Sequence, residues 1–372
     1  MKVGISESSA VFRDRTPKPY DGIGYYTRQL IDSMREQGKD MLPCYFSSVS
    51  EPLTTLFPQR DVTLQPCVYY KQLLPFHLHR DLEKTIDVFH CTDFRVPKLK
   101  RVPIVASLHD AIMLKHAEYT NLKLRKLKNH VLRKHASYAD QVIAVSHAMV
   151  EDIVRYWQVP EEKINVVYHG VDESWLIKKS DQQKKAVLEK YNIEKNYVFF
   201  SGTLQPRKNL ERLIRAFRAL PKEVLDAHQL IIVGKNGWGS EGVLDAIRAG
   251  EREGLIRWLG YIPFDDVKTL CQAASAVAYV SLSEGFGLPI LDGFASGTPV
   301  ITSSVSSMPE IAGGGAYLVD PENIDNIRQA LLDVLTDATL QSRLVDLGNK
   351  RVRDFSWKKC VEQTYKVYEK VV

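Results

Sequence analysis

One stretch decides the fold of this chain: Ser281-Leu-Ser-Glu284-Gly-Phe-Gly-Leu-Pro-Ile-Leu-Asp292. The apolar run at residues 276–280 just before it has the length and β-rich composition of a buried strand. Pro289 suits the first turn of a helix, and Gly297 suits the end of that helix. The predicted order is therefore strand, glycine loop and short helix. This order places Glu284 at the carboxyl end of a parallel strand, where open α/β sheets bind ligands.

Two acids and a row of backbone amides are predicted to meet at this edge. Glu284 and Asp292 are eight positions apart, so both carboxylates can face one crevice. A helix N-terminus attracts anions through its dipole and its backbone N–H groups. The amides expected to meet an anion belong to Gly285, Phe286, Gly287 and Leu288.

The spacing of these acids resembles the paired-acid motif of the retaining, nucleotide-sugar-dependent glycosyltransferases of family 4, in which two acids flank seven residues. The second acid of that family is usually Glu, and here Asp292 is one methylene shorter. The resemblance implies that Glu284 holds hydroxyls of the donor sugar. It implies that Asp292 holds the ribose.

Bulk properties favour a two-domain globular protein. At 372 residues the chain exceeds the size of a comfortable single core. Its five cysteines are scattered and form no Cys-x-x-Cys pair, which favours reduced thiols in the cytosol over structural zinc. No apolar run suits a signal peptide or a membrane span. We therefore expect a cytoplasmic protein that is at most peripheral on the inner face of the cell membrane.

Apolar runs with the character of strands alternate with helical segments along the chain. In the first half, strands are expected at residues 2–6, 41–46, 88–92, 104–108 and 141–145. A second series begins at residues 197–202, and the charged residues 177–196 between the two series are the expected linker. This alternation predicts α/β domains with parallel, doubly wound, Rossmann-like sheets.

The resemblance to family 4 implies the GT-B architecture, in which two Rossmann-like domains face each other across a cleft. Residues 1–176 would then form the acceptor-binding domain, and residues 177–356 the domain that binds the nucleotide sugar. A helix at residues 357–372 would cross back and pack on the first domain.

Two motifs of the first half are candidates for the site. Gly22-Ile-Gly24 follows the first strand, where glycines let a backbone approach phosphate, although a lone Gly-x-Gly is a weak signal. His109 follows the strand at residues 104–108, a place where a histidine is more often structural when seen alone. The resemblance implies that His109 meets the donor sugar. Asp110 would either orient the ring or cap the next helix.

The second half contributes cations at the end of its first strand. Arg207 and Lys208 belong to Gly202-Thr-Leu-Gln-Pro-Arg-Lys-Asn209, and in this strand-loop-helix context cations and amide dipoles can hold a diphosphate. The segment closely resembles a family 4 signature. The resemblance further implies that Tyr261 lies near the nucleotide base. Glu310 either lies beside the donor site or caps a helix.

Residues 115–135 are the most strongly basic part of the chain, with Glu118 as their single acid. The basic side chains are Lys115, Lys123, Arg125, Lys126, Lys128, Arg133 and Lys134. Leu124, Leu127, Val131 and Tyr138 recur at helical spacing and predict an apolar face. The segment is either a solvated helix or a helix that docks on an anionic membrane. Nucleic acid is disfavoured as a partner because neither a recognition module nor a stacking platform accompanies the charge.

The expected reaction is transfer of a hexose from a nucleoside diphosphate. Arg207, Lys208 and the amides of residues 285–288 are expected to stabilise the leaving phosphate, so no metal is expected. The resemblance implies retention, with the leaving phosphate accepting the acceptor's proton. His109 would position the sugar ring near the developing oxocarbenium ion.

The motifs look most like the mannosyltransferase branch that builds bacterial O-antigen from GDP-mannose on lipid-linked oligosaccharide or glycan acceptors. GDP-rhamnose or a UDP-sugar remains an alternative donor. A nicotinamide dehydrogenase is disfavoured because Thr27 stands where Gly-x-Gly-x-x-Gly has its third glycine. Another alternative is a nucleotide-sugar or polyanion binding protein without catalysis. The chain lacks a lysine motif for the pyridoxal phosphate of a phosphorylase.

Overall fold

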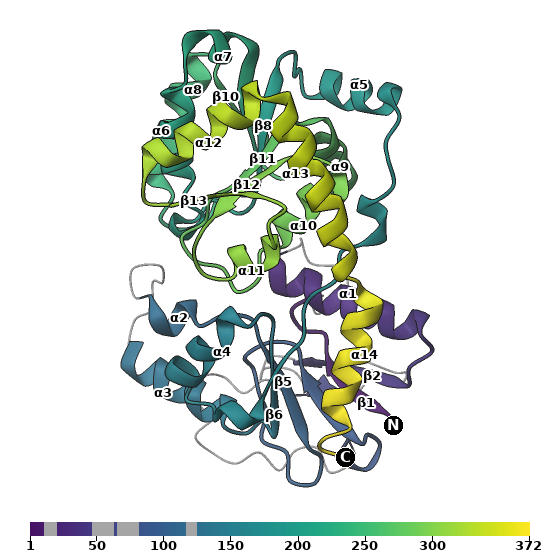
Figure 1. Cartoon of the computed structure of the whole chain (residues 1–372). Helices are drawn as coiled ribbons and strands as arrows, with labels where there is room; N and C mark the ends of the chain where they lie inside the picture. The colour runs from purple at the N-terminus through teal and green to yellow at the C-terminus, as the bar shows by residue number, and fades with distance from the viewer. Residues whose placement is uncertain (11–20, 47–62, 65–81, 117–124) are drawn as a thin grey trace. The chain divides into compact units, whose positions relative to one another are not determined.

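The chain folds into two compact units, seen in a computed structural model that describes residues 1–10, 21–46, 63–64, 82–116 and 125–372 (Figure 1). Unit 1 comprises Met1–Gly170 together with Ser356–Val372, and unit 2 comprises Val171–Phe355. The chain therefore enters unit 2 after Gly170 rather than after residue 176. Residues 177–196, the expected linker, belong to unit 2.

Unit 1 is built on a parallel sheet with the strand order β3-β2-β1-β4-β5-β6-β7. Its strands are β1 Val3–Ser6, β2 Met41–Phe46, β3 Thr63–Leu64, β4 Val88–Cys91, β5 Ile104–Leu108, β6 Gln141–Ala144 and β7 Ile164–Val166. The strands β1, β4 and β5 are buried along their whole length, as expected for a parallel sheet covered on both faces. The order reverses direction between β1 and β4, which confirms the predicted doubly wound topology.

The last helix of the chain, α14, packs against α1, the first helix of unit 1. The helical segments of unit 1 are α1 Gly22–Glu36, η1 Leu82–Lys84, α2 Ile112–Lys115, α3 Arg125–Ala136, α4 Ala148–Asp152, the π-helical turn η2 Ile153–Trp157, η3 Glu161–Lys163 and α14 Trp357–Tyr368. Trp357 and Tyr368 of α14 are buried. The C-terminal helix thus completes the core of unit 1.

Unit 2 has a parallel sheet with the strand order β10-β9-β8-β11-β12-β13. Its strands are β8 Asn196–Ser201, β9 His228–Val233, β10 Ile256–Trp258, β11 Ala276–Tyr279, β12 Val300–Ser303 and β13 Tyr317–Val319. Numbered within the unit this is the order 3-2-1-4-5-6, which is typical of dinucleotide-binding Rossmann folds. The sequence order of the strands changes direction between β8 and β11, although the two strands are parallel. The loops that follow them therefore leave toward opposite faces of the sheet.

Helices cover both faces of the unit 2 sheet (Figure 1). They are η4 Glu173–Trp175, α5 Asp181–Lys190, η5 Pro206–Lys208, α6 Leu210–Arg218, α7 Lys222–Ala227, α8 Glu241–Arg252, α9 Phe264–Ala273, α10 Leu288–Ser296, α11 Met308–Ala312, α12 Ile324–Thr336, α13 Ala338–Arg351 and η6 Val352–Asp354. Helix α6 packs against α8 and α12, and α10 packs against α9 and α13. The sheet is therefore the middle of three layers.

Residues at the helix ends explain both α10, which the sequence predicted, and α5, which it did not. Helix α10 begins with Pro289 in its first turn and ends at Gly297, whose φ of +70° is the left-handed conformation that glycine adopts readily. Helix α5 lies in the expected linker, where few residues are buried. A capping box holds its N-terminus, because Ser180 and Gln183 each accept a hydrogen bond from the other's backbone amide.

The lysine and arginine side chains of residues 115–135 fall into two groups: some are bonded within the fold and others are exposed. Lys115 pairs with Asp152 at 3.0 Å, and the guanidinium of Arg133 donates to the Tyr156 carbonyl, so both have roles within the fold. Lys126 and Lys134 are exposed on α3. Leu127, predicted on the apolar face, is also exposed, which corrects that expectation, whereas Val131 is buried as predicted. Lys123 and Leu124 lie outside the described residues.

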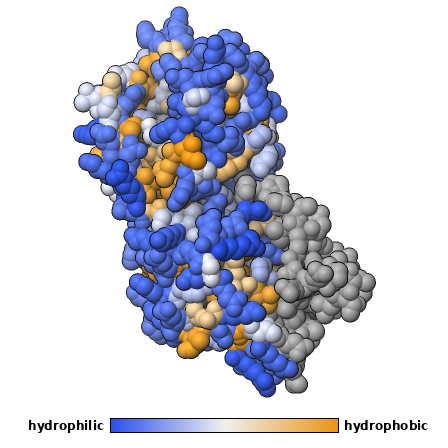
Figure 2. All heavy atoms as spheres, turned by 90° about the vertical axis from the view of Figure 1, so that its right-hand side faces the viewer, coloured by the Kyte–Doolittle hydropathy of each residue, from blue (hydrophilic) through white to orange (hydrophobic). Residues whose placement is uncertain are grey.

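Hydrophilic side chains cover most of the face shown in Figure 2, and hydrophobic side chains lie in small groups among them. In the part of the chain that the structure describes, no helix is both long enough and apolar enough to cross a membrane.

Gly170→Ala is expected to destabilise unit 1. A Cβ atom at Gly170 would lie 2.1 Å from the Trp357 amide nitrogen and 2.6 Å from its Cα, and backbone atoms cannot yield cheaply. The expected loss is about 1–3 kcal/mol of unfolding free energy, measured by denaturant titration. Gly22→Ala is the control, because a Cβ there meets no atom within 4 Å. An equal stability of both variants would contradict this account of how α14 is held.

Candidate active site

The candidate site of unit 2 lies where the strand order reverses, between β8 and β11. In open α/β sheets, ligands bind outside the carboxyl ends of the strands at such a point. The loop after β8 carries Arg207 and Lys208, and the loop after β11 carries Glu284. Sequence positions far apart are thus brought together by the topology of the sheet.

Backbone and amide hydrogen bonds join these two loops. The Leu282 amide donates to the Arg207 carbonyl at 2.8 Å. The buried Asn209 side chain donates to the Val280 carbonyl at 2.9 Å and to the Pro321 carbonyl at 2.7 Å. Asn209 has a φ of +59°, which directs the chain from the turn η5 into α6. The loops therefore form one rigid support for the charged side chains.

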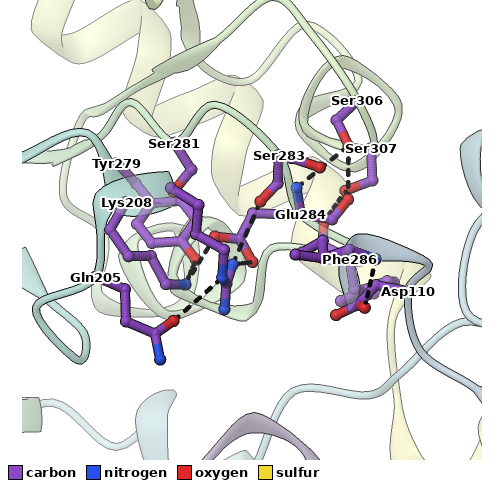
Figure 3. A network of polar contacts seen from close by, with 12 residues as sticks. Asp110, Gln205, Lys208, Tyr279, Ser281, Ser283, Glu284, Phe286, Ser306 and Ser307 are labelled. Carbon is purple, nitrogen blue, oxygen red and sulfur yellow. Dashed lines mark hydrogen bonds and ion pairs between the residues drawn. The ribbon is translucent and has the colours of Figure 1, made fainter. Parts of the chain in front are cut away.

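Glu284 lies between the two cations. One carboxylate oxygen, Oε2, is 2.7 Å from Arg207 Nη1, and the other, Oε1, is 2.7 Å from Lys208 Nζ. Both Glu284 and Lys208 are buried, while Arg207 keeps a fifth of its side chain exposed. Figure 3 shows the side chains of Lys208 and Glu284 pointing toward each other. The three groups together carry a net charge of +1, which leaves the cluster attractive to an anion.

The cations determine the ionisation of Glu284. Burial opposes the charged form, but the attraction of Arg207 and Lys208 outweighs it and lowers the pKa of Glu284 from 4.5 to about 2. The side chain is therefore a carboxylate at neutral pH. It can accept hydrogen bonds from sugar hydroxyls, and it cannot serve as a proton donor there.

Tyr279 is a member of the cluster that the sequence reasoning missed. Its buried hydroxyl contacts Lys208 Nζ, and the ammonium lies 4.8 Å from the ring centroid (Figure 3). Burial raises the pKa of Tyr279 well above its usual range, so the hydroxyl stays protonated beside the cation. The available signal was a single tyrosine at the end of an otherwise aliphatic strand, which the sequence reading assigned to the core.

Two serines that the sequence reading did not single out fix the loop after Glu284. Ser306 Oγ accepts from the Glu284 amide at 3.2 Å and donates to the Glu284 carbonyl at 2.6 Å. Ser307 Oγ contacts the Phe286 carbonyl at 2.8 Å. Ser306 holds a φ of +59°, a conformation that costs a non-glycine residue energy and recurs at functional sites. The bonds from these serines orient the peptide of Glu284 and the segment that leads to α10.

Asp292 occupies a different environment from Glu284. It lies on α10 and is half-buried. Burial, with the nearby carboxylate of Asp172, raises the pKa of Asp292 well above its usual range. The surroundings therefore act on the two acids in opposite directions: they favour the charged form of Glu284 and disfavour that of Asp292. The assignment of Asp292 to the ribose stays a prediction.

The glycine motif of unit 1 has a structural explanation. Asp21 caps α1 by accepting from the Gly24 amide at 2.7 Å. A Cβ at Gly24 would lie 2.7 Å from the Ser9 carbonyl oxygen, so close packing requires glycine there without any ligand. Gly22 is exposed, with open space where a side chain would stand. Contact of either glycine with a phosphate stays a prediction.

His109 is held within unit 1 by a hydrogen bond to a backbone carbonyl and by contact with an aromatic ring. Its Nε2 lies 2.9 Å from the Thr92 carbonyl, which requires the proton on Nε2 and leaves Nδ1 as an acceptor. Burial lowers the pKa of His109, and the bond to Thr92 opposes this only in part. Asp110 accepts from the amide of Ile112, the first residue of α2, at 3.0 Å, so its carboxylate contacts the start of that helix, although the N-cap residue is Ala111.

Tyr26 supports His109 from α1. Its ring meets the imidazole edge-on at a centroid distance of 4.6 Å. Its hydroxyl bonds Ser107 Oγ at 2.9 Å, and Ser107 bonds His90, whose other nitrogen meets the Tyr368 hydroxyl of α14 at 2.6 Å. This buried chain of hydrogen bonds connects Tyr368 of the C-terminal helix to Tyr26, whose ring contacts His109.

The remaining predicted positions are placed as follows. Tyr261 follows β10 and is 57% exposed, so its ring is available to a ligand of unit 2. The Glu310 carbonyl accepts from Arg351 at 2.7 Å, and the residue lies in the first turn of α11. Among the described residues, no group of three or more His, Cys, Asp or Glu side chains is arranged to hold a metal ion.

Both halves of the chain match known glycosyltransferase families. Residues 181–351 match the family described as "Glycosyl transferases group 1", and residues 20–175 match "Glycosyltransferase Family 4". The O-antigen chain mannosyltransferase B of Escherichia coli is 32% identical over 284 residues, covering 76% of this chain and 74% of that protein. The chain belongs to glycosyltransferase family 4.

Two further comparisons extend this result. The serotype-specific mannosyltransferase WbdA of Escherichia coli is 26% identical to this glycosyltransferase over 59% of the chain, which spans only 27% of that longer protein. The crystal structure of Anabaena Alr3699/HepE in complex with UDP and glucose aligns over 100% of both chains. Its TM-score is 0.73 at 22% sequence identity, which shows a shared fold. The predicted GT-B fold class is confirmed at the level of two Rossmann-like units.

We expect the contribution of Glu284 to the stability of this glycosyltransferase to depend on pH. Because its pKa is about 2 in the folded state and near 4.5 when unfolded, its stabilising effect is complete above pH 4.5. It is lost as the pH falls toward 2. The difference in unfolding free energy between the wild type and Glu284→Gln should be about 3 kcal/mol at neutral pH and shrink below pH 4.5.

Denaturant titrations between pH 2.5 and 7 measure this difference. Glu241→Gln, at an exposed position on α8, is the matched control and should show no comparable pH dependence. A Glu284→Gln difference that stays constant across this range would show that the ion pairs do not hold Glu284 in its charged form.

Proposed function

We propose that this glycosyltransferase transfers an α-mannosyl group from GDP-mannose, with retention of configuration, to a lipid-linked or oligosaccharide acceptor in bacterial O-antigen synthesis. The observation that carries the proposal is the cluster of Arg207 and Lys208 around Glu284 at the reversal point of the unit 2 sheet. The mannosyltransferase activity named for the two Escherichia coli relatives supports the choice of sugar.

The cluster suits a diphosphate leaving group. Its two cations stand on a rigid support and are balanced only in part by one carboxylate, so the cluster keeps a net positive charge that can pair with a diphosphate. Preorganised donors of this kind are worth most where charge develops in the transition state. The amides of Gly285, Phe286, Gly287 and Leu288 are proposed to add to the field at the start of α10.

The reaction breaks the bond between C1 of the sugar and the phosphate oxygen and forms a bond between C1 and an acceptor hydroxyl oxygen. The electron pair of the broken bond stays on the diphosphate, which then accepts the proton of the acceptor hydroxyl. Glu284 is held ionised and accepts hydrogen bonds from the sugar hydroxyls. No enzyme carboxylate needs to become a nucleophile, in contrast to retaining glycosidases.

His109 and Asp292 take complementary roles in this proposal. His109 is neutral, with Nδ1 as its acceptor, so it orients a hydroxyl of the donor sugar without adding positive charge beside the oxocarbenium ion. Asp292, driven toward its neutral form, can both donate to and accept from the ribose hydroxyls. The shorter side chain thus keeps two hydrogen-bonding functions.

The choice of donor base depends on contacts outside the cluster of Arg207, Lys208 and Glu284. GDP-rhamnose or a UDP-sugar would use the same cations and the same carboxylate. The crystal structure of Anabaena Alr3699/HepE contains UDP and glucose, which keeps the UDP alternative open for this chain. A binding experiment distinguishes the bases directly.

GDP is expected to raise the thermal unfolding midpoint of the wild type more than UDP or ADP at equal concentration, because a ligand that binds only the folded state stabilises it. Lys208→Ala should lose most of this shift. With GDP-mannose and a glycan acceptor, its turnover should fall about a hundredfold or more.

Release of GDP and extension of the acceptor measure that turnover. Lys350→Ala, an exposed lysine on α13, is the charge-matched control. Near-normal activity of Lys208→Ala would exclude its role at the leaving group. A larger shift of the unfolding midpoint with UDP than with GDP would show that UDP, rather than GDP, is the nucleotide of the donor.

We further propose that α3 docks the enzyme on the inner face of the cell membrane. Lys126 and Lys134 are exposed together with Leu127, which places two cations and an apolar side chain on the outer surface of one helix. Such a surface suits an anionic bilayer, to which each lysine adds about 1 kcal/mol.

The double variant Lys126→Ser/Lys134→Ser should bind anionic lipid vesicles about tenfold or more weakly, because two such charges are removed. Its activity on a water-soluble acceptor should be unchanged. Lys358→Ser/Lys366→Ser, which removes two exposed lysines of α14, is the matched control. Vesicle sedimentation measures binding. Equal binding of the wild type and the two double variants would show that α3 is a solvated helix without a role at the membrane.

A further inference from the structure

Trp238 is an exposed aromatic side chain beside the candidate diphosphate site. It lies in the loop between β9 and α8 and is 43% exposed. The chain has five tryptophans, and Trp157, Trp175 and Trp357 are buried, while the indole of Trp258 donates to the Gly234 carbonyl at 2.9 Å. An exposed, flat aromatic ring can stack on a flat ligand.

The loop that carries Trp238 is fixed against the loop that carries the cations. Both of its neighbours are glycines that pack on residues 203–206: a Cβ at Gly237 would lie 2.3 Å from the Leu204 carbonyl oxygen, and one at Gly239 would lie 3.1 Å from Pro206 Cγ. Gly239 has a φ of +68°. The indole is thus presented next to the segment that leads directly into Arg207.

Further hydrogen bonds hold this arrangement. The Leu204 amide donates to the Lys235 carbonyl at 3.0 Å, which joins the loops after β8 and β9. Ser240 Oγ contacts Asn236 Oδ1 at 2.5 Å and the Gly237 carbonyl at 2.8 Å, which closes the loop on itself. The Gly234 amide donates to the Gly260 carbonyl at 2.8 Å and so ties in the loop of Tyr261.

The loops therefore form a row along the carboxyl edge of the sheet, in the order of their strands. Tyr261 follows β10, Trp238 follows β9, the cations follow β8 and Glu284 follows β11. Neighbouring strands are about 5 Å apart, so the ends of β9 and β10 lie about 5 and 10 Å from that of β8. A nucleoside attached to a diphosphate at the cations reaches across this span.

We propose that Trp238 stacks on the heterocyclic base of the nucleoside diphosphate. The indole is flat and exposed, its loop packs on residues 203–206, and base–aromatic stacking is a strong contact that tolerates different bases. This inference rests on the proposed function, because it takes the diphosphate to lie at Arg207 and Lys208. It adds a residue of the β9 loop to the donor site, next to Tyr261.

Calorimetric titration of the full chain with GDP, UDP and ADP tests the proposal. For whichever nucleotide the wild type binds most tightly, Trp238→Ala should weaken binding about tenfold or more, and Trp238→Phe should retain most of the affinity. The affinity for inorganic pyrophosphate should stay unchanged in both variants, because the cations are intact. Melting curves verify that the variants are folded.

Tryptophan fluorescence gives a second measurement. Nucleotide binding should quench the emission of the wild type and of Trp258→Phe, the matched control, and this quenching should be absent from Trp238→Phe. Unchanged nucleotide affinity in Trp238→Ala, or an effect on the acceptor KM alone, would overturn the base contact and leave the proposed function standing. An equal loss of pyrophosphate affinity would show a structural role instead. A wild type that binds none of the three nucleotides would overturn this inference and the proposed function together.

Discussion

The candidate site depends on one electrostatic constraint: a buried carboxylate, Glu284, must be matched by cations. An isolated buried charge is costly, and breaking a buried pair leaves its partner uncompensated. Arg207 and Lys208 supply the match from a different loop, each at 2.7 Å. The loops after β8 and β11 are therefore coupled, and their backbone hydrogen bond between Leu282 and Arg207 makes the coupling geometric as well as electrostatic.

The same constraint explains the residues behind the cluster. Tyr279 places a hydroxyl and a ring against the Lys208 ammonium, which compensates for its burial. Ser306 and Ser307 hold the backbone of the Glu284 loop, and Ser306 does so from a left-handed conformation. Each of these residues helps to hold Lys208 or the Glu284 loop in place. The cations and the carboxylate themselves are the groups that we propose to meet the ligand.

The two acids of the motif show how the surroundings assign different chemistry to similar side chains. Glu284 is flanked by cations and stays ionised, whereas desolvation and the nearby carboxylate of Asp172 disfavour the charged form of Asp292. Their spacing along the chain is the same as in the family motif, but spacing carries no information about charge state. Unit 1 gives a parallel case, since His109 is kept neutral by burial and its tautomer is set by the Thr92 carbonyl.

The sequence by itself determined the two doubly wound units and the strand ends that carry Arg207, Lys208 and Glu284, because apolar periodicity, glycine and proline are local signals. Tertiary structure decided what depends on distant neighbours. Helix α5 formed in an expected linker through its capping box and its packing on α9. Leu127 proved exposed, Gly24 proved to be required by Ser9, and Tyr279 and Ser306 joined the site, because burial and contact across strands are fixed only when the chain has folded.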